Sequence, residues 1–260
     1  MNHQNSLDLS AFDQWLRNLL KPELFKDYCP NGLIVESGAK VHRVVCGVSL
    51  SMELIHEAIE SKADAIIVHH PHGFWNNQPK LPVGMMAKKI RSLLSEGVSL
   101  WGFHLPLDGH PEVGNNVGIA RALGAEPYGS FMREGQADVG LLCRFAPSME
   151  PKDLQQKATA LFGNAGVIHA LMFGPQRIET IAICSGGGAS GIDEALKCGV
   201  QAYLTGEIKE SHPIQAREEG FHLLACGHYA TEMFGPRLLA ERITQDLGIP
   251  ADFVDVPNPI

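Results

Sequence analysis

Short runs of apolar residues alternate along this chain with longer segments whose apolar residues recur at the spacing of a helix. The runs predict buried strands, and the longer segments predict helices that pack against them. Such alternation is typical of a mostly parallel sheet covered by helices, so the predicted fold class is α/β. The predicted strands are 44–50, 65–70, 179–185 and 201–207, with 98–108 and 221–232 each running into a loop; the predicted helices include one capped by Ser10 and those at 51–62, 83–96, 192–198, 211–219 and 233–247, and a strand, a helix and a strand are predicted within 137–174.

The order of these elements repeats. Each half of the chain runs strand, helix, strand, helix, strand and a closing helix, as expected for a duplicated unit. We therefore predict a first α/β repeat over residues 1–130 and a second over 131–260. Ligand sites in open α/β sheets lie at the carboxyl ends of the strands, so polar residues at matching strand ends are the candidates for chemistry.

Two adjacent histidines close the strand predicted at 65–70. Three apolar residues lead to His69 and His70, and Pro71 cannot extend a sheet ladder, so the strand is predicted to end there. Neighbouring side chains of a strand point to opposite faces, so the pair suits two metal ions that each take one imidazole. The alternative is that both are core or rim histidines that bond to backbone carbonyls, and a histidine pair alone does not decide between the two.

The last strand of each repeat ends in a histidine that is followed, four positions later, by a carboxylate. These pairs are His104 with Asp108 and His228 with Glu232. Glu207 ends the middle strand of the second repeat, where the first repeat has its histidine pair. Both repeats therefore bring imidazole and carboxylate groups to equivalent strand ends, and a duplicated unit can pair them around one cleft.

Imidazole and carboxylate ligands together indicate zinc, iron, manganese or nickel, whereas calcium prefers oxygen alone. Two such ions about 3.5–4 Å apart need a bridging group, and metal pairs of this kind hydrolyse phosphate, ester or amide bonds. They lower the pKa of a shared water, which becomes a nucleophile near neutral pH. Asp108 or Glu232 can bridge the ions, and His69, His70 and His228 are the expected terminal ligands.

Two candidate catalytic residues and a glycine-rich turn complete the set. His104 and Glu207 are expected near enough to the metals to move protons or to orient ligands, although His104 also suits a helix-end hydrogen bond and Glu207 a solvated strand tip. The turn Gly186-Gly-Gly can face an anion with its backbone amides. It fits neither the Walker pattern nor the dinucleotide fingerprint.

Composition narrows the classes of function. The chain has 260 residues, of which 45% are hydrophobic, and this is ample for a folded core. Its net charge of −8 argues against a general nucleic-acid or anionic-membrane binder, which needs a basic face. The start of the chain lacks the regions of a signal peptide, and no apolar run is long enough to span a bilayer. The six cysteines are scattered, as reduced core thiols are, so we expect a cytoplasmic protein.

Together the motifs resemble those of the NIF-three-like family of dinuclear-metal proteins, also called GTP cyclohydrolase I type 2-like. The matching stretches follow the family's order over nearly the whole chain, at 31–36, 68–71, 104–108, 204–207, 227–232 and 256–260. The resemblance implies two intertwined α/β repeats and, for this short bacterial form, a toroidal homohexamer with its metal sites facing the cavity. It also implies the metal ligands His69, His70, Asp108, His228 and Glu232, with His104 nearby. His72 and Leu105-Pro106 depart from many relatives but leave these ligands intact.

We therefore predict a metal-dependent hydrolase with two metal ions, acting on a small nucleotide-like or pterin-precursor substrate. One alternative is a metal-binding scaffold or metal-handling protein that performs no chemistry. A second alternative is a ring that encloses a nucleic-acid strand, which the acidic net charge disfavours.

Overall fold

The computed structural model describes residues 5–75, 81–163 and 168–260, and these form two compact units. Unit 1 comprises Met1–Leu107 and Gly235–Val256, and unit 2 comprises Asp108–Phe234 and Pro257–Ile260. The chain leaves unit 1, builds unit 2 and then returns, so the units are intertwined. The division into compact units does not test whether residues 1–130 and 131–260 are duplicated repeats, so the two repeats stay a prediction.

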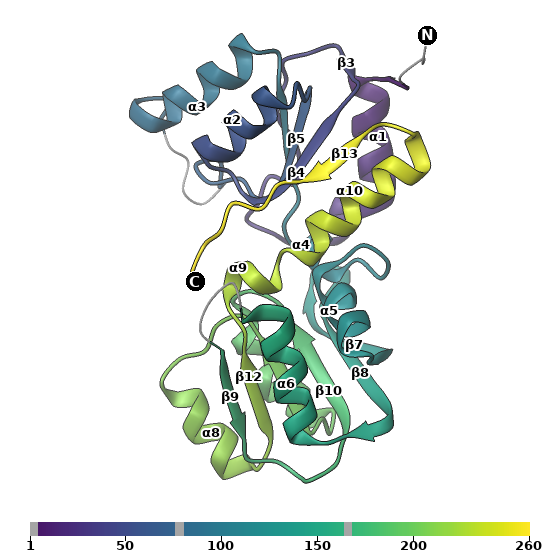
Figure 1. Ribbon diagram of the computed structural model, residues 1–260, viewed down its shortest axis with the longest axis vertical. Helices are drawn as coiled ribbons and strands as arrows, with labels where there is room; N and C mark the ends of the chain where they lie inside the picture. Colours follow the sequence, from purple (N-terminus) through teal and green to yellow (C-terminus); the bar gives the residue numbers. More distant parts are fainter. Residues whose placement is uncertain (1–4, 76–80, 164–167) are drawn as a thin grey trace. The chain divides into compact units, whose positions relative to one another are not determined.

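Unit 1 is a sheet packed with helices, and most of it comes from the first part of the chain (Figure 1). Its elements are β1 (Leu7–Asp8), α1 (Leu9–Leu20), the 3-10 turn η1 (Pro22–Leu24), β2 (Gly32–Val35), β3 (Lys40–Val41), β4 (Val44–Ser49), α2 (Met52–Glu60), β5 (Ala65–His70), α3 (Gly84–Ser95) and β6 (Ser99–Gly102), with the returning α10 (Phe234–Leu247) and β13 (Ala251–Phe253). The five-stranded sheet has the order β13-β4-β5-β6-β2, with every pairing parallel except that of β2 with β6. The predicted mostly parallel sheet is therefore confirmed in this unit.

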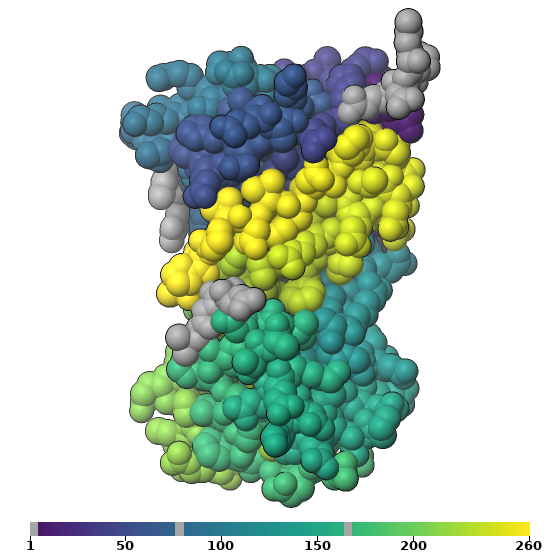
Figure 2. Space-filling model, in the orientation of Figure 1, coloured from purple at the N-terminus to yellow at the C-terminus, as the bar shows by residue number. Residues whose placement is uncertain are grey.

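The returning segment completes the unit 1 sheet at its edge. Strand β13 pairs in parallel with β4, and the Val44 amide donates to the Pro250 carbonyl just before that ladder begins. Figure 2 shows these C-terminal residues, in yellow, against the purple and blue N-terminal part of the same unit. A strand distant in sequence thus protects an edge that would otherwise expose unpaired backbone groups.

Alternating side chains of the unit 1 strands fill a core on each face of the sheet. On one face, Val45 and Ile66 pack in a buried cluster with Leu54 of α2. On the other, the Trp101 ring meets the Phe12 ring of α1 edge-on, with centroids 5.4 Å apart. Both faces are therefore covered, which explains why the strands read as continuous apolar runs.

Of the two predicted helix caps, one is confirmed and the other is wrong. Ser51 caps α2 as predicted, because its hydroxyl accepts a hydrogen bond from the Leu54 amide at 3.0 Å. Ser10 does not cap the first helix, which begins one residue earlier, at Leu9, with Asp8 at the cap position. The amide of Leu9 donates instead to the carbonyl of Ala39, so a loop contact satisfies this helix end.

Unit 2 is a mixed sheet with helices. After α4 (Leu105–Gly109), which crosses the unit boundary, its elements are α5 (Asn115–Leu123), β7 (Glu126–Glu134), β8 (Ala137–Met149), α6 (Pro151–Phe162), β9 (His169–Met172), β10 (Ile178–Cys184), the 3-10 turn η2 (Gly188–Gly191), α7 (Ile192–Lys197), β11 (Ala202–Thr205), α8 (Ser211–Glu219), β12 (His222–Ala225) and α9 (His228–Thr231). The sheet order is β7-β8-β10-β11-β12-β9. Its three central strands β10, β11 and β12 are parallel, and the outer strands are antiparallel.

In the antiparallel part of unit 2 the sequence pattern missed one strand. The strand, helix and strand predicted within 137–174 are present as β8, α6 and β9, but the strand β7 at 126–134 was not predicted. Most β7 residues are exposed, so this strand lacks the apolar face that identifies a strand in the sequence.

Two further predictions concern membrane-spanning helices and cysteines. Over the part of the chain that the structure describes, no helix has both the length and the apolar character needed to cross a bilayer. Five of the six cysteines are buried, as expected for core thiols, whereas Cys198 is exposed. The loose segment predicted between strand 65–70 and the next helix includes residues 76–80, which lie outside the described residues.

Candidate metal centre

Three buried histidines cluster at the carboxyl end of strand β5 in unit 1. His69 and His70 are the last residues of β5, as predicted, and His104 follows the end of β6, the neighbouring strand. The ring centroids lie 4.6 Å apart for His69 and His70, and 5.1 Å apart for His69 and His104. One nitrogen from each ring lies within 4.8 Å of the others, so this group can hold a metal ion.

The two adjacent rings converge, although alternation along a strand predicts opposite directions. The ladder between β5 and β6 ends at Val68, paired with Gly102. His69 and His70 therefore extend beyond the last residue that β6 pairs, and their ring centroids lie 4.6 Å apart. The geometry favours ligands of one centre over ligands that face away from each other.

Each of these rings is held through Nδ1. The Nδ1 of His69 bonds the Phe103 carbonyl at 3.0 Å, and that of His70 bonds the Ser49 hydroxyl at 3.3 Å across the β4–β5 ladder. A carbonyl oxygen can only accept, so His69 carries its hydrogen on Nδ1 and its lone pair on Nε2. Metal-binding histidines are oriented by such contacts from the ring nitrogen that does not bind the metal.

A buried aspartate that sequence reasoning did not single out orients His104. The Nδ1 of His104 donates to the Asp27 carboxylate, with distances of 3.0 and 3.2 Å to its two oxygens. The same carboxylate accepts from the amides of Cys29 and Leu105, each at 3.0 Å, and from the side-chain amide of Asn31 at 2.9 Å. Burial raises the pKa of Asp27, but the hydrogen bonds and the charge of His104 outweigh it and lower that pKa to about 2.

The unit 2 candidates gather around the short helix α9. His228 begins α9 and Glu232 follows its end, and this spacing places both side chains on one side of the turn. The Nε2 of His228 lies 3.1 Å from a carboxylate oxygen of Glu232, and its Nδ1 lies 2.6 Å from Glu207. Glu207 therefore orients a histidine, while half of its own side chain stays in solvent.

Asp108 lies beside Glu232 within the same unit. An oxygen of each carboxylate lies within 4.8 Å of the other, and Asp108 accepts hydrogen bonds of 2.9 Å from Asn115 and Ser185. Both carboxylates are buried. Two buried carboxylates at this separation repel each other unless a proton or a cation lies between them.

The negative charge of the carboxylates around His228 favours a cation. Burial lowers the pKa of His228, but hydrogen bonds and charges from Glu232 and then Glu207 outweigh it and raise that pKa to about 9. The imidazole is therefore held as a cation by the two carboxylates. A divalent metal ion can meet the same demand for positive charge.

The glycine-rich turn after β10 fits against this group. Gly186 has a φ of +57°, and a Cβ built on it would lie 2.0 Å from a carboxylate oxygen of Glu232. Its amide donates to the Thr231 hydroxyl, and its carbonyl accepts from the amides of Gly206 and Glu207. The close approach of backbone to Glu232 explains this glycine, whereas nothing in these contacts indicates a phosphate cradle.

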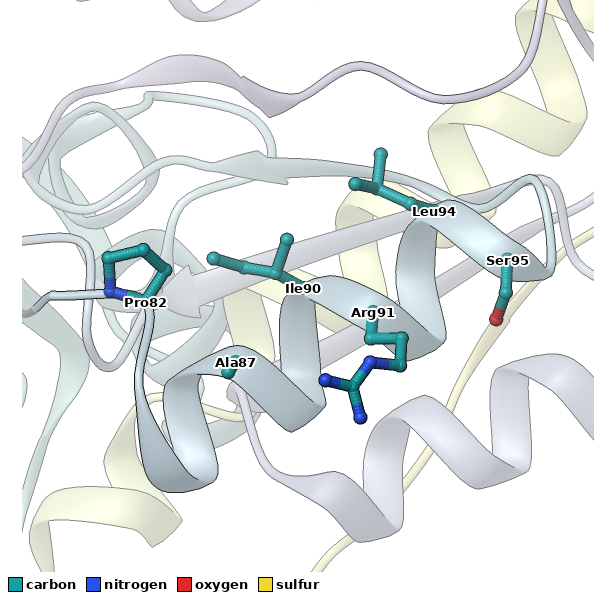
Figure 3. Close-up of a pocket in the computed structure, with 6 residues that line it drawn as sticks. All are labelled: Pro82, Ala87, Ile90, Arg91, Leu94 and Ser95. Atoms are coloured by element: carbon teal, nitrogen blue, oxygen red, sulfur yellow. The ribbon is translucent and has the colours of Figure 1, made fainter.

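An apolar hollow on helix α3 lies apart from the predicted residues. Figure 3 shows Pro82, Ala87, Ile90 and Leu94 lining it, together with Arg91 and Ser95. None of the lining residues is an imidazole or a carboxylate. The hollow therefore shares no residue with the candidate histidine and carboxylate groups.

Fold and side chains define the class: an α/β protein of two intertwined units with buried histidine and carboxylate groups that can hold metal ions. The chain belongs to the family Duf34/NIF3 (NGG1p interacting factor 3), whose model matches residues 7–259. The family that the motifs resembled is therefore confirmed.

Relatives span the full chain. A Pseudomonas aeruginosa protein named GTP cyclohydrolase 1 type 2 homolog is 41% identical over 98% of this chain and 99% of its own length. A Vibrio cholerae protein of the same name is 38% identical over 98% and 100%. Among solved structures, "protein ybgI, unknown function" superposes with a TM-score of 0.90 at 35% identity, over 98% of this chain and all of that one. TTHA1606 from Thermus thermophilus does so with a TM-score of 0.83 at 29% identity, over the same shares.

Proposed function

We propose that this protein is a metal-dependent hydrolase with two divalent metal ions bound by His69, His70, Asp108, His228 and Glu232. His104 and Glu207 are the proposed catalytic candidates. The substrate is a small nucleotide-like molecule, a proposal supported by relatives that are named GTP cyclohydrolase 1 type 2 homolog. The homohexamer and the cytoplasmic location stay predictions from the family resemblance and the sequence.

One observation carries the proposal. All four imidazoles of the predicted site, His69, His70, His104 and His228, have Nδ1 engaged by an oxygen of the protein. In each ring the protein therefore holds the Nδ1 side, and in His228 a carboxylate oxygen of Glu232 also lies 3.1 Å from Nε2. Metal-binding histidines are oriented by an oxygen at the ring nitrogen that does not bind the metal, so this shared arrangement supports metal binding.

The donor set fits the proposed ions. Imidazole nitrogen with carboxylate oxygen suits zinc, iron, manganese or nickel. Bound ions would supply a water of lowered pKa as the nucleophile. The protein's own residues supply orientation: Asn115 and Ser185 hold Asp108, and Glu207 holds His228.

His104 suits proton transfer within this arrangement. Its Nδ1–H is fixed by Asp27, so the ring presents Nε2 as the atom that accepts or returns a proton. The buried Asp27 carboxylate also stabilises the imidazolium that forms when the proton is held. Glu207, which is half exposed, is placed to exchange protons with solvent.

Metal analysis of matched variants tests the proposal. Protein purified without chelator is expected to contain two divalent ions per chain, and His69→Ala and Glu232→Ala are each expected to lose at least one while the circular dichroism spectrum is retained. His56→Ala, an exposed histidine of α2, is the control and should keep both ions. Wild-type protein that contains no metal would refute the proposal.

Turnover separates the enzyme from a metal-binding scaffold. We expect hydrolysis of GTP or of a member of a phosphoester panel that a chelator abolishes and that added metal restores. His104→Ala should lower turnover and keep the metal, because His104 is not among the proposed ligands. Metal-loaded protein that is inert toward the whole panel would favour the scaffold.

A further inference from the structure

The segment that follows β10 contacts both buried carboxylates of unit 2. The Ser185 hydroxyl donates to Asp108 at 2.9 Å. The next residue, Gly186, lies against Glu232, and a Cβ built on it would be 2.0 Å from a carboxylate oxygen. Asp108 and Glu232 offer oxygens that lie within 4.8 Å of each other. The placement of two consecutive residues therefore limits how the two carboxylates can be spaced.

Thr231 holds this segment from the side of α9. Its hydroxyl accepts from the Gly186 amide at 2.9 Å and donates to the Gly227 carbonyl at 2.9 Å. Thr231 is fully buried, so its removal would leave polar groups that cannot turn to water. Because Thr231 immediately precedes Glu232, one side chain joins the turn to the helix end that bears the carboxylate.

Tyr203 holds the same turn from its other end. Its hydroxyl donates to the Gly188 carbonyl at 2.6 Å. The side chain is fully buried, and burial raises the pKa of Tyr203 far above its usual value, so the phenol stays protonated as a donor. Tyr203 belongs to β11, which pairs in parallel with β10. Hydroxyls from two different elements therefore hold the turn, at Gly186 and at Gly188.

We propose that Thr231 and Tyr203 are positioning residues, whose hydroxyls hold the turn 186–188 so that Glu232 lies at a fixed distance from Asp108. Neither residue is a proposed metal ligand, and both act through the backbone of the turn. The inference rests on the proposed function and deepens it, because the spacing of two carboxylates decides how well they share a divalent cation.

The turn itself is closely packed. Gly186 has a φ of +57°, which L side chains rarely adopt, and its carbonyl accepts from the amides of Gly206 and Glu207. A Cβ built on Gly188 would lie 2.5 Å from the Cys184 sulfur. Close packing transmits a displacement at either hydroxyl to the carboxylate, because there is little space in which to absorb it.

Crystal structures of metal-free variants test the positions directly. Thr231→Val keeps the shape of the side chain and removes the hydroxyl. We expect it to move the Glu232 carboxylate, relative to β10 and β11, by more than about 0.5 Å, which is the tolerance of a preorganised site. Tyr203→Phe should also move the carboxylate, because it releases the turn at its other end, whereas Thr231→Ser keeps the hydroxyl and should leave Glu232 in place.

Thr159→Val is the matched control. The Thr159 hydroxyl also donates to the carbonyl four residues earlier, at 2.9 Å, but it lies on the exposed side of α6. Its loss therefore removes a similar bond to a helix carbonyl without touching the turn. The Glu232 carboxylate should stay in place in this variant.

Cation binding measures the consequence for the site. Metal-free protein is titrated with Co²⁺, and the visible absorption of the bound ion gives the number of ions and each Kd. We expect Thr231→Val and Tyr203→Phe to raise the Kd of at least one ion about tenfold, as the loss of a contact that orients a ligand does. Thr231→Ser and Thr159→Val should bind as wild type does. Thermal unfolding followed by circular dichroism confirms that each variant is folded at the temperature of the titration.

The outcomes separate the two proposals. If Glu232 stays in place in Thr231→Val and Tyr203→Phe, or if Thr231→Ser moves it as far as Thr231→Val does, the positioning role is refuted. Displacement in Thr231→Val alone would overturn the role of the turn, since Thr231 would then act on its neighbour directly. An unchanged Kd in both displaced variants would refute the link to cation binding. If wild type binds no Co²⁺, the metal-dependent function fails, and the crystal structures still decide the positioning role.

Discussion

Replacing Asp27 by Asn tests whether one buried charge holds together the loop around His104 in unit 1. The Asp27 side chain is only 1% exposed, and it accepts from two backbone amides, from Asn31 and from His104. Asn keeps the shape but turns one acceptor into a donor and removes the charge. Donors then face a donor in a buried position, which is costly because neither can turn to water.

The size of the effect follows from the pKa. The folded protein lowers the pKa of Asp27 from 3.8 to about 2, which corresponds to about 2 kcal/mol of stabilisation of the charged form. The donors left facing the amide add roughly 1–3 kcal/mol. We therefore expect Asp27→Asn to lower the free energy of unfolding of unit 1 by about 2–4 kcal/mol at neutral pH, since the two contributions overlap.

The pH dependence has a defined sign. Because the pKa of Asp27 is lower in the folded protein, the stability it contributes is fully present above pH 3.8 and is lost as pH falls through about 2. The difference between wild type and Asp27→Asn should therefore be constant from pH 5 to pH 7, and the part of it that comes from charge should shrink below pH 3.8.

Guanidinium denaturation followed by tryptophan fluorescence is the assay, because Trp15, Trp75 and Trp101 all belong to unit 1. Asp8→Asn is the control: Asp8 is exposed and its contact with Lys40 is a surface ion pair, which contributes at most about 1 kcal/mol. If Asp27→Asn costs no more than Asp8→Asn, the Asp27 contacts do not hold the loop and the argument fails.

Two further predictions follow from unit 2. Gly199 has a φ of +78° and open space where a Cβ would lie, so Gly199→Ala should cost only about 1 kcal/mol of backbone strain, whereas Gly186→Ala should cost at least about 2 kcal/mol, because its Cβ meets Glu232, and should lower metal content. Thermal unfolding by circular dichroism measures both variants, and equal losses would contradict the close approach. Iodoacetamide should label Cys198 well before the other thiols of the native protein, since Cys198 is exposed and burial raises the pKa of Cys143 and Cys226 to about 12; peptide mapping that finds Cys143 or Cys226 labelled equally fast would refute this.

The candidate residues at the strand ends could be predicted from the sequence, because each is identified by residues close to it in the chain. An apolar run identifies β5, and Pro71 marks its end, so His69 and His70 could be placed at a strand tip without coordinates. The spacing of His228 and Glu232 likewise fixes a common side of one helical turn. The close approach of the His69 and His70 rings could not be predicted, because the alternation of side chains along a strand predicts opposite directions.

The role of Asp27 could not be predicted from the sequence, since it depends on a contact with a residue that is distant in the chain. It lies 77 positions before His104, in a loop with no periodic pattern. An aspartate two residues before a turn is ordinarily explained by a local bond to the backbone, and Asp27 does make that bond, to Cys29. Only the folded chain shows that the same carboxylate also faces an imidazole.

The four Nδ1 atoms have different hydrogen-bond partners, and these partners distinguish the histidines in a way that substituting the ligands cannot. They are a backbone carbonyl for His69, a hydroxyl for His70 and carboxylates for His104 and His228. A carboxylate partner adds charge to the ring it holds, whereas a carbonyl or hydroxyl adds orientation only. Glu207 therefore supports His228 as a ligand through charge as well as orientation, whereas neutral oxygens only orient His69 and His70. If the proposed ions differ in affinity, the ion that His228 binds should be the one retained longest during dialysis against chelator, because its ligand is strengthened by Glu207.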